Sequence, residues 1–154
     1  MSGRAAWRLE SLGFADVHRY QPGKDDWLAA RLPVAGAAAG VRRAADVARP
    51  DVPVCGLRDQ VSGVATRVLE ERWPLAVVVN EHGVVLGRLR PGDLDAHPDA
   101  EAADLLVAGP RTMRGTRPVD EMAAWLEERR IPGVLVTTAD GVLVGYVRRE
   151  DVAG

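Results

Sequence analysis

The residues of this sequence best suited to chemistry are two aspartates in related positions. Asp93 and Asp151 lie 58 positions apart, and each follows an arginine, Arg90 or Arg148, by three positions. A carboxylate accepts hydrogen bonds from ligand hydroxyls, and the planar guanidinium of arginine can pair with a phosphate through parallel hydrogen bonds. An aspartate is also a good helix N-cap. The pattern therefore predicts two related positions that serve either ligand binding or helix capping.

Catalytic chemistry finds little support among the remaining residues. His18, His82 and His97 are far apart and lack metal-ligating neighbours at useful spacing, so we expect them on the solvated surface and expect no metal site. The sequence contains no P-loop, dinucleotide fingerprint or nucleophile elbow. Cys55 is expected to be a buried core residue. We therefore expect a protein that is not an enzyme and has no resident cofactor.

Composition limits the class of protein further. The 154 residues carry 20 basic and 22 acidic side chains without a long block of one sign, which makes nucleic acid an improbable partner. The single cysteine rules out an intramolecular disulfide and a thiolate zinc site and fits a reducing compartment. Without a signal peptide or an apolar run of membrane-spanning length, we expect a cytoplasmic protein with no membrane partner.

An internal repeat determines the architecture that must position these residues. A shift of 58 positions aligns Ala44–Val47 with Ala102–Leu105, and Asp93 with Asp151, without a gap. About 14 of roughly 51 aligned pairs are identical. The repeat predicts an α+β fold of two units, each a small three-stranded sheet with two helices. So small a sheet leaves an apolar face uncovered, and we expect the two units to pack together and bury it.

Each copy shows the same order of expected elements. Apolar residues at helical spacing predict one amphipathic helix in each copy, and short β-branched runs followed by Gly-containing turns predict a hairpin. Short helices are expected at the start and the end of each copy. The helices of the two copies centre on 61–69 and 119–126, their first hairpin strands on 75–79 and 134–137, and their second hairpin strands on 84–89 and 142–147.

The end of each copy resembles the most recognisable motif of cystathionine-β-synthase-type (CBS) domains. The family pattern is Asp-Gly, an apolar strand, Gly, two apolar residues, a polar position, two variable residues and Asp. The second copy matches it at Gly141–Val152 and the first at Gly83–Leu94, and both copies carry a proline before the preceding strand, in 72–78 and 130–136. The resemblance covers roughly residues 44–153. It implies a pair of CBS domains related by a pseudo-twofold axis, with two clefts that in the family often bind AMP, ADP, ATP or S-adenosylmethionine.

The resemblance also implies particular site residues. Asp93 and Asp151 are the ribose-binding candidates, and Arg90 and Arg148 stand where the family usually has Ser or Thr, so that each arginine either pairs with a phosphate or fills the cleft. For the apolar candidates, plain core packing remains the alternative. The remaining cleft-lining candidates are Thr112, Met113, Ile131, Pro132 and Val134 in the second copy, and Val54, Cys55, Trp73, Pro74 and Ala76 in the first.

Residues 1–36 lie outside the repeat and resemble the C-terminal end of a rhodanese. A helix closing at Gly13, a strand over Asp16–Tyr20 and a Trp-bearing helix over Asp25–Pro33 are expected there. The rhodanese cysteine has no counterpart in this segment, so sulfur transfer is not expected. The predicted division is an appendage over 1–36, a linker over 37–43, and CBS domains over 44–97 and 98–154.

Two functions follow from these patterns. The first is a regulatory module that binds an adenosine-containing small molecule in the clefts. The second is a ligand-free dimerisation or interaction scaffold whose clefts are blocked by Arg90 and Arg148. The resemblance implies a homodimer in either case.

Overall fold

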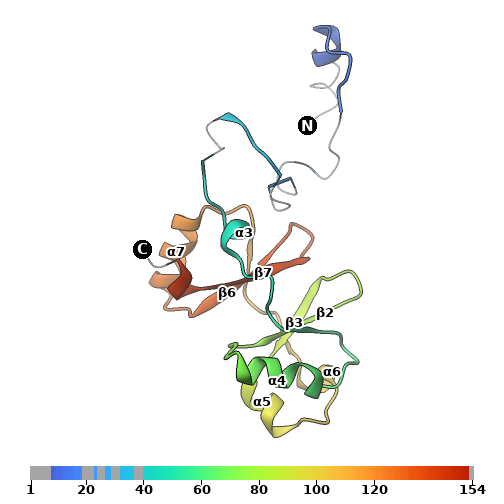
Figure 1. The fold of residues 1–154 in the computed structure, drawn as a ribbon, viewed down its shortest axis with the longest axis vertical. Helices are drawn as coiled ribbons and strands as arrows, with labels where there is room; N and C mark the ends of the chain where they lie inside the picture. Colours follow the sequence, from blue (N-terminus) through green and yellow to red (C-terminus); the bar gives the residue numbers. More distant parts are fainter. Residues whose placement is uncertain (1–7, 19–22, 24–26, 29–31, 37–39, 153–154) are drawn as a thin grey trace.

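The protein has two similar units joined side by side (Figure 1). The structure is a computed structural model that describes residues 8–18, 23, 27, 28, 32–36 and 40–152. The first unit contains β1 (Val54–Cys55), α4 (Ser62–Glu70), β2 (Ala76–Val79), β3 (Val85–Leu89) and α5 (Pro91–Ala96). The second contains β5 (Thr112–Arg114), α7 (Val119–Glu128), β6 (Gly133–Thr137), β7 (Leu143–Arg148) and the 3-10 turn η2 (Arg149–Asp151). Short elements precede each unit, namely α3 (Ala44–Val47), α6 (Ala102–Leu105) and β4 (Val107–Ala108).

The sequence repeat is reproduced in the strand pairing. In the first sheet β1 runs parallel to β2 with Val54 opposite Val77, and in the second β5 runs parallel to β6 with Thr112 opposite Leu135. Both central strands pair antiparallel with the strand that follows. The predicted fold class is confirmed, with one addition. The first sheet has a fourth strand, because β4 pairs antiparallel with β3.

The short helix at the start of each repeat packs on the other unit. In α3 the backbone N–H groups of Ala44 and Ala45 donate to carbonyl groups of the second unit at 2.8 and 3.0 Å. In α6 the N–H groups of Ala102 and Ala103 donate to the first unit, both at 2.9 Å. These bonds satisfy donors at helix starts that would otherwise be unpaired. The two units are therefore tied together by an exchange of helices.

The hairpin turns of the two units also meet. The N–H of Val85 donates to the carbonyl of Gly141 at 3.0 Å, and the N–H of Leu143 donates to that of Gly83 at 2.9 Å. Gly83 and Gly141 have φ angles of 74° and 83°, in the region that glycine adopts without strain. The predicted turns are therefore both the ends of the hairpins and a point of contact between the units.

Two hydrophobic cores hold the units. One lies under α4 and the first sheet, and the other lies under α7 and the second sheet. Leu135 and Tyr146 belong to the second sheet but are buried in the first core, at 1% and 2% exposure. The apolar face that one small sheet cannot cover is thus buried against the other unit, as the repeat predicted.

The N-terminal segment is described only in part. Residues 8–11 are helical and Gly13 has a φ of 92°, as expected for the helix that closes there. Residues 16–18 are not in a strand, and the rest of the expected strand lies outside the described residues. Of the expected helix over 25–33, residues 27 and 28 are helical, and 25, 26 and 29–31 also lie outside the described part. The rhodanese resemblance stays a prediction. None of the described helices is long and apolar enough to cross a membrane.

Candidate functional site

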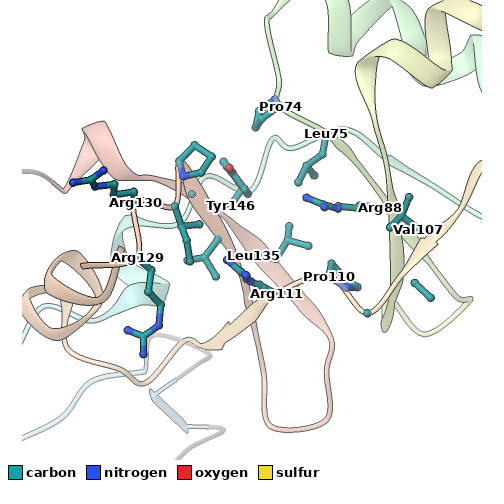
Figure 2. A pocket seen from close by; sticks show the side chains of 16 residues that line it. Pro74, Leu75, Arg88, Val107, Pro110, Arg111, Arg129, Arg130, Leu135 and Tyr146 are labelled. Carbon is teal, nitrogen blue, oxygen red and sulfur yellow. The ribbon is translucent and has the colours of Figure 1, made fainter. Parts of the chain in front are cut away.

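Two neighbouring crevices open between the units. The first, which we name the Arg88 crevice, has a volume of about 460 Å³ (Figure 2). It is lined by Pro74, Leu75, Arg88, Val107, Ala108, Gly109, Pro110, Arg111, Arg129, Arg130, Ile131, Pro132, Gly133, Val134, Leu135 and Tyr146. The second, the Arg148 crevice, has a volume of about 480 Å³ and is lined by Arg72, Pro74, Pro132, Tyr146, Arg148, Arg149 and Glu150. The crevices share Pro74, Pro132 and Tyr146, so these residues separate two parts of one groove.

Arg88 is the most distinctive residue of the Arg88 crevice. It comes from β3 of the first unit, and its side chain extends toward the second unit (Figure 2). Its Nε is buried and has no hydrogen-bond partner. A buried donor on a charged group costs free energy unless it is paired. Arg88 is therefore ready to donate to an anion that enters the crevice.

The electrostatic character of the Arg88 crevice is uniformly positive. Among the described residues that line it, four are arginines and none is acidic. Arg129 already pairs with Glu128 at 2.7 Å and lies 5.3 Å from the centre of the Trp125 ring. Within the described part of the chain, Arg88 and Arg111 make no ion pair. Such a wall attracts a negatively charged ligand group.

Tyr146 forms the floor between the two crevices. Its ring lies against β6 at Gly133, where a Cβ atom would collide with the tyrosine hydroxyl. Burial raises the pKa of Tyr146, while the nearby charges of Arg148 and Arg88 act in the opposite direction. The tyrosine is thus neutral and can only donate or accept a hydrogen bond at physiological pH.

Trp73 contacts two arginines, Arg49 and Arg148, the second of which lines the Arg148 crevice. The guanidinium carbons of Arg49 and Arg148 lie 4.4 and 5.1 Å from the centre of its indole ring. The edge of Tyr146 faces it at 6.3 Å between ring centres, and its Nε1 donates to Glu71 at 2.9 Å. Only 2% of Trp73 is exposed. These contacts therefore fix the position of the indole ring next to β2.

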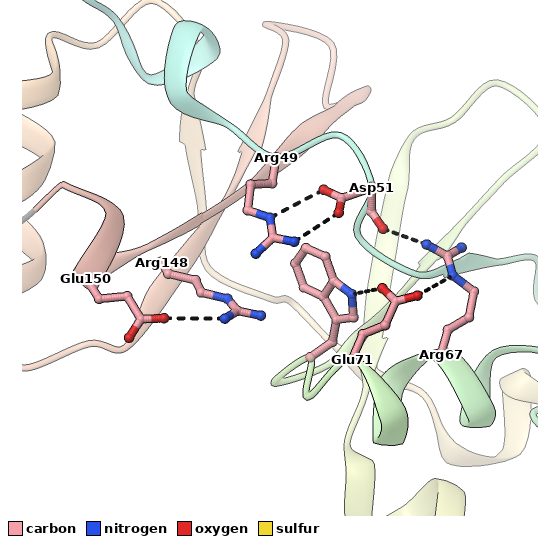
Figure 3. A network of polar contacts seen from close by, with 7 residues as sticks. Arg49, Asp51, Arg67, Glu71, Arg148 and Glu150 are labelled. Carbon is pink, nitrogen blue, oxygen red and sulfur yellow. Dashed lines mark hydrogen bonds and ion pairs between the residues drawn. The ribbon is translucent and has the colours of Figure 1, made fainter.

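A chain of polar contacts runs from Arg49 through Asp51 and Arg67 to Glu71, which accepts the hydrogen bond of Trp73 (Figure 3). Arg49 pairs with Asp51 at 2.9 Å, and this hydrogen bond holds the pKa of Asp51 below its usual value. Arg67 donates to the Asp51 carbonyl at 2.7 Å and lies 3.7 Å from the Glu71 carboxylate. The carboxylates near Trp73 are thus already neutralised by arginines of the same unit, although exposed pairs of this kind add little stability.

The structure gathers some of the predicted site residues and separates others. Ile131, Pro132 and Val134 line the Arg88 crevice, and Arg148 lines the other. Pro74 lines both. The remaining second-copy candidates line neither crevice: Thr112 is exposed on β5, Met113 is in the second core, and Asp151 is exposed in η2.

The first-copy candidates mostly lie elsewhere. Cys55 and Ala76 are buried in the first core together with Trp73. Val54 is 38% exposed, Arg90 is exposed, and Asp93 is partly buried in α5. Of this set, only Pro74 lines a crevice described above.

Sequence reasoning missed Arg88, Arg111 and Tyr146. Strand alternation offered one signal, because residues two positions apart share a face of a strand. Arg88 lies two positions before Arg90, and Tyr146 lies two positions before Arg148. No such signal marks Arg111, whose position depends on the loop that leads into β5.

Cys55 gives a prediction on the pH dependence of stability. Burial, with a smaller contribution from the charge of Asp59, raises the pKa of its thiol from 9.0 to about 11. Between pH 9 and 11 the unfolded chain therefore loses the thiol proton while the native protein keeps it. We expect the free energy of unfolding to be unaffected by this group below pH 9 and to fall by on the order of 2 kcal/mol as the pH rises through this range.

Urea denaturation of the wild type and of Cys55→Ala, at pH values below 9 and near 11, tests this. Tyr146 titrates in both proteins, so the difference between their pH profiles isolates the thiol. Parallel loss of stability in the two proteins would contradict the expectation.

Comparison with known proteins establishes the fold. No family model and no curated protein sequence matches the chain. The structure of CBSX2 in complex with AMP is 20% identical over 71% of this chain and 92% of that one, with a TM-score of 0.60, and CBSX2 from Arabidopsis thaliana is described as a CBS-pair protein. The CBS-domain pair of protein MJ0100, in complex with 5′-methylthioadenosine and S-adenosyl-L-methionine, is 19% identical over 73% of this chain and 93% of that one, with a TM-score of 0.58.

A third similar structure is part of a larger protein. The cytosolic domain of the Mg²⁺ channel MgtE in complex with ATP is 21% identical over 72% of this chain, with a TM-score of 0.62. The match covers 47% of that domain. At these identities the likeness establishes a shared fold.

Proposed function

Since the chain has the fold of a CBS-domain pair, we propose that it is a cytoplasmic regulatory module that binds an adenosine-containing ligand in the Arg88 crevice. The observation that carries this proposal is the buried, unpartnered Nε of Arg88 at the wall of a crevice of about 460 Å³. This volume is within the usual range for small-molecule sites. AMP, ADP, ATP and S-adenosylmethionine are the candidate ligands, and ligands of this type accompany the similar structures.

The walls of the crevice suit the parts of a nucleotide. Leu75, Ile131 and Leu135 supply apolar surface on which a base can lie. Arg88 and Arg111 supply donors for a negatively charged group. Cys55 is buried away from this wall with a raised pKa, so it offers no thiolate nucleophile there. In this proposal the crevice holds and releases its ligand without catalysing a reaction.

The position of the crevice explains how binding would regulate. Its lining comes from both units, so a bound ligand contacts the first unit through Arg88 and the second through Ile131 and Pro132. A ligand that prefers one packing of the units shifts the population toward it. The exchanged helices α3 and α6 would transmit that change between the units.

A second candidate function is an interaction scaffold that binds no ligand. The observation in its favour is Arg148, which lies over the Trp73 ring and takes up space beside the Arg148 crevice. Arg90, the other arginine of this hypothesis, is exposed and lines neither crevice. In the scaffold hypothesis the homodimer is the functional form, and adenosine ligands leave the stability of the protein unchanged.

For residues 1–36 we retain the proposal of an appendage that resembles the end of a rhodanese. The segment contains no cysteine, so the proposal assigns it no sulfur transfer. Leu12 and Phe14 are 60% and 59% exposed. In Figure 1 the described residues 8–18 lie apart from the two sheets, and the ligand site is proposed without their participation.

A thermal-shift screen against AMP, ADP, ATP and S-adenosylmethionine separates the two functions. We expect at least one of these ligands to raise the melting temperature, because binding at a hundredfold excess over Kd stabilises the native state by about 2.7 kcal/mol. Arg88→Ala should remove most of this shift, and Arg90→Ala, at an exposed arginine that lines neither crevice, should retain it. If none of the four ligands shifts the wild type, the sensor proposal fails and the scaffold remains.

A further inference from the structure

The two copies have side chains of different size and charge at equivalent positions around the crevices. This difference determines how many ligands one chain can bind. The shift of 58 positions that relates the copies also relates their backbone pairing. Arg49 pairs with Tyr146, and the equivalent residues of the other copy, Val107 and Arg88, also pair with each other. The Arg88 crevice therefore has a counterpart between the units, beside Trp73, and its equivalent residues Arg72, Pro74, Pro132 and Tyr146 line the Arg148 crevice. We infer that only the Arg88 crevice binds ligand and that Trp73 fills the part of the counterpart where a base would lie, which is an inference that rests on the proposed function.

The first reason is steric. Ile131, which lines the Arg88 crevice, corresponds to Trp73 in the first unit. Isoleucine is much smaller than tryptophan. The Trp73 indole is 2% exposed, with the guanidinium groups of Arg49 and Arg148 at 4.4 and 5.1 Å from its ring centre and Tyr146 at its edge. An aromatic ring that contacts two guanidinium groups thus already occupies the space where a base would have to stack.

The second reason is electrostatic. Three arginines of the Arg88 crevice make no ion pair in the described part of the chain: Arg88 and Arg111 correspond to Tyr146 and Pro53 on the other side, and Arg130 corresponds to Arg72. Two further residues that line the Arg88 crevice, Gly109 and Arg129, correspond to the acidic residues Asp51 and Glu71. These carboxylates pair with Arg49 and Arg67. The described lining of the Arg88 crevice contains no carboxylate, whereas an anionic ligand beside Trp73 would also meet Asp51, Glu71 and, in the Arg148 crevice, Glu150. Arginine is not confined to one side, because Arg148 also has a buried Nε without a hydrogen-bond partner.

The same arrangement selects the class of ligand. The described lining of the Arg88 crevice contains four arginines and no carboxylate. A phosphate group can accept hydrogen bonds from Arg88 and Arg111, whereas S-adenosylmethionine has a net positive charge, because its sulfonium and ammonium groups outweigh its single carboxylate, and is disfavoured among four arginines. The crevice therefore takes a phosphorylated adenosine nucleotide, with one ligand per chain.

Isothermal titration calorimetry on the full chain with AMP, ADP, ATP and S-adenosylmethionine tests the inference. We expect one nucleotide per chain and at least tenfold weaker binding of S-adenosylmethionine. Arg88→Ala and Arg111→Ala should each weaken nucleotide binding about tenfold or more, since a hydrogen bond to a charged group contributes about 1.5–3 kcal/mol. Arg58→Ala and Arg90→Ala, at exposed arginines outside both crevices, should bind as the wild type does.

Substitutions at Ile131 test the steric argument separately. Ile131→Trp introduces into the Arg88 crevice the tryptophan that the first unit has at the equivalent position, and it should abolish nucleotide binding. Ile131→Leu should retain it. Circular dichroism melting shows whether each variant is folded. If Ile131→Trp does not fold, the stoichiometry and the arginine variants still decide the inference.

The outcomes distinguish the inference from the proposed function. Two nucleotides per chain, equal binding of S-adenosylmethionine, or nucleotide binding unaffected by both arginine variants would overturn the inference and leave an adenosine-binding module in place. Unweakened binding by a folded Ile131→Trp would overturn it as well. Absence of heat with all four ligands, together with no thermal shift, would overturn the proposed function itself.

Discussion

Replacing Trp73 with alanine is expected to lower the free energy of unfolding by about 3–5 kcal/mol, the usual cost of truncating a large buried aromatic residue. Only 2% of the side chain is exposed. The variant loses the edge contact with Tyr146, the two guanidinium contacts and the hydrogen bond to Glu71. Tyr146 and Arg148 belong to β7 of the second unit, so removal of the ring also weakens the contact between the two units.

Urea denaturation followed by circular dichroism measures this loss. Trp125→Ala is the matched control, because Trp125 is only partly buried at the second core, where Arg129 lies 5.3 Å from its ring centre. Trp125→Ala should cost clearly less. If the two variants lose the same stability, Trp73 is not the central packing residue that its surroundings indicate.

Gly145→Ala is expected to destabilise the protein by about 3 kcal/mol. A Cβ atom at Gly145 would lie 2.5 Å from the carbonyl oxygen of Arg49 and 2.8 Å from its carbonyl carbon. Backbone cannot move aside as a flexible side chain can, and overpacking of this kind costs about 1–3 kcal/mol. The same displacement would break the two 2.9 Å hydrogen bonds between Arg49 and Tyr146. Each such bond contributes about 1 kcal/mol.

Gly63→Ala is the control for this substitution. Gly63 is on α4, and a Cβ atom there meets no atom within 4 Å. Because alanine is the better helix former, this variant should be unchanged or more stable by up to about 1 kcal/mol. If Gly145→Ala and Gly63→Ala have the same urea midpoint, the backbone of Arg49 lies farther from Gly145 than these distances indicate.

Much of the fold could be predicted because it is encoded locally. Helical spacing predicts an apolar face of Val61, Val64, Ala65, Val68 and Leu69; the three valines are buried and Ala65 is partly buried, whereas Leu69 is 45% exposed. Gly83 and Gly141 predict the hairpin turns because each turn needs a positive φ. The fourth strand of the first sheet was not predictable in this way. Val107 and Ala108 form it only because the chain between the units passes along the edge of β3.

The site was predictable only where the repeated motif itself supplies the residues. Ile131, Pro132 and Arg148 come from that motif and line the crevices. Asp93 and Asp151 come from it too, yet they line neither crevice. The motif gives the position of a residue along the chain, whereas membership of a crevice depends on which surface the other unit covers.

The sequence by itself determined that this protein is built from two copies of one α+β unit, because strand and helix periodicity and turn glycines act over a few residues and recur at a constant offset. Only the tertiary structure decided that α3 and α6 are exchanged between the units, and that Arg88 lines the Arg88 crevice alone while its counterpart Tyr146, a core residue, lies between the two crevices. The physical reason is that these contacts join segments far apart in the chain. Their free energy depends on how the whole surfaces of the two units fit, so unlike residues at equivalent positions acquire different roles.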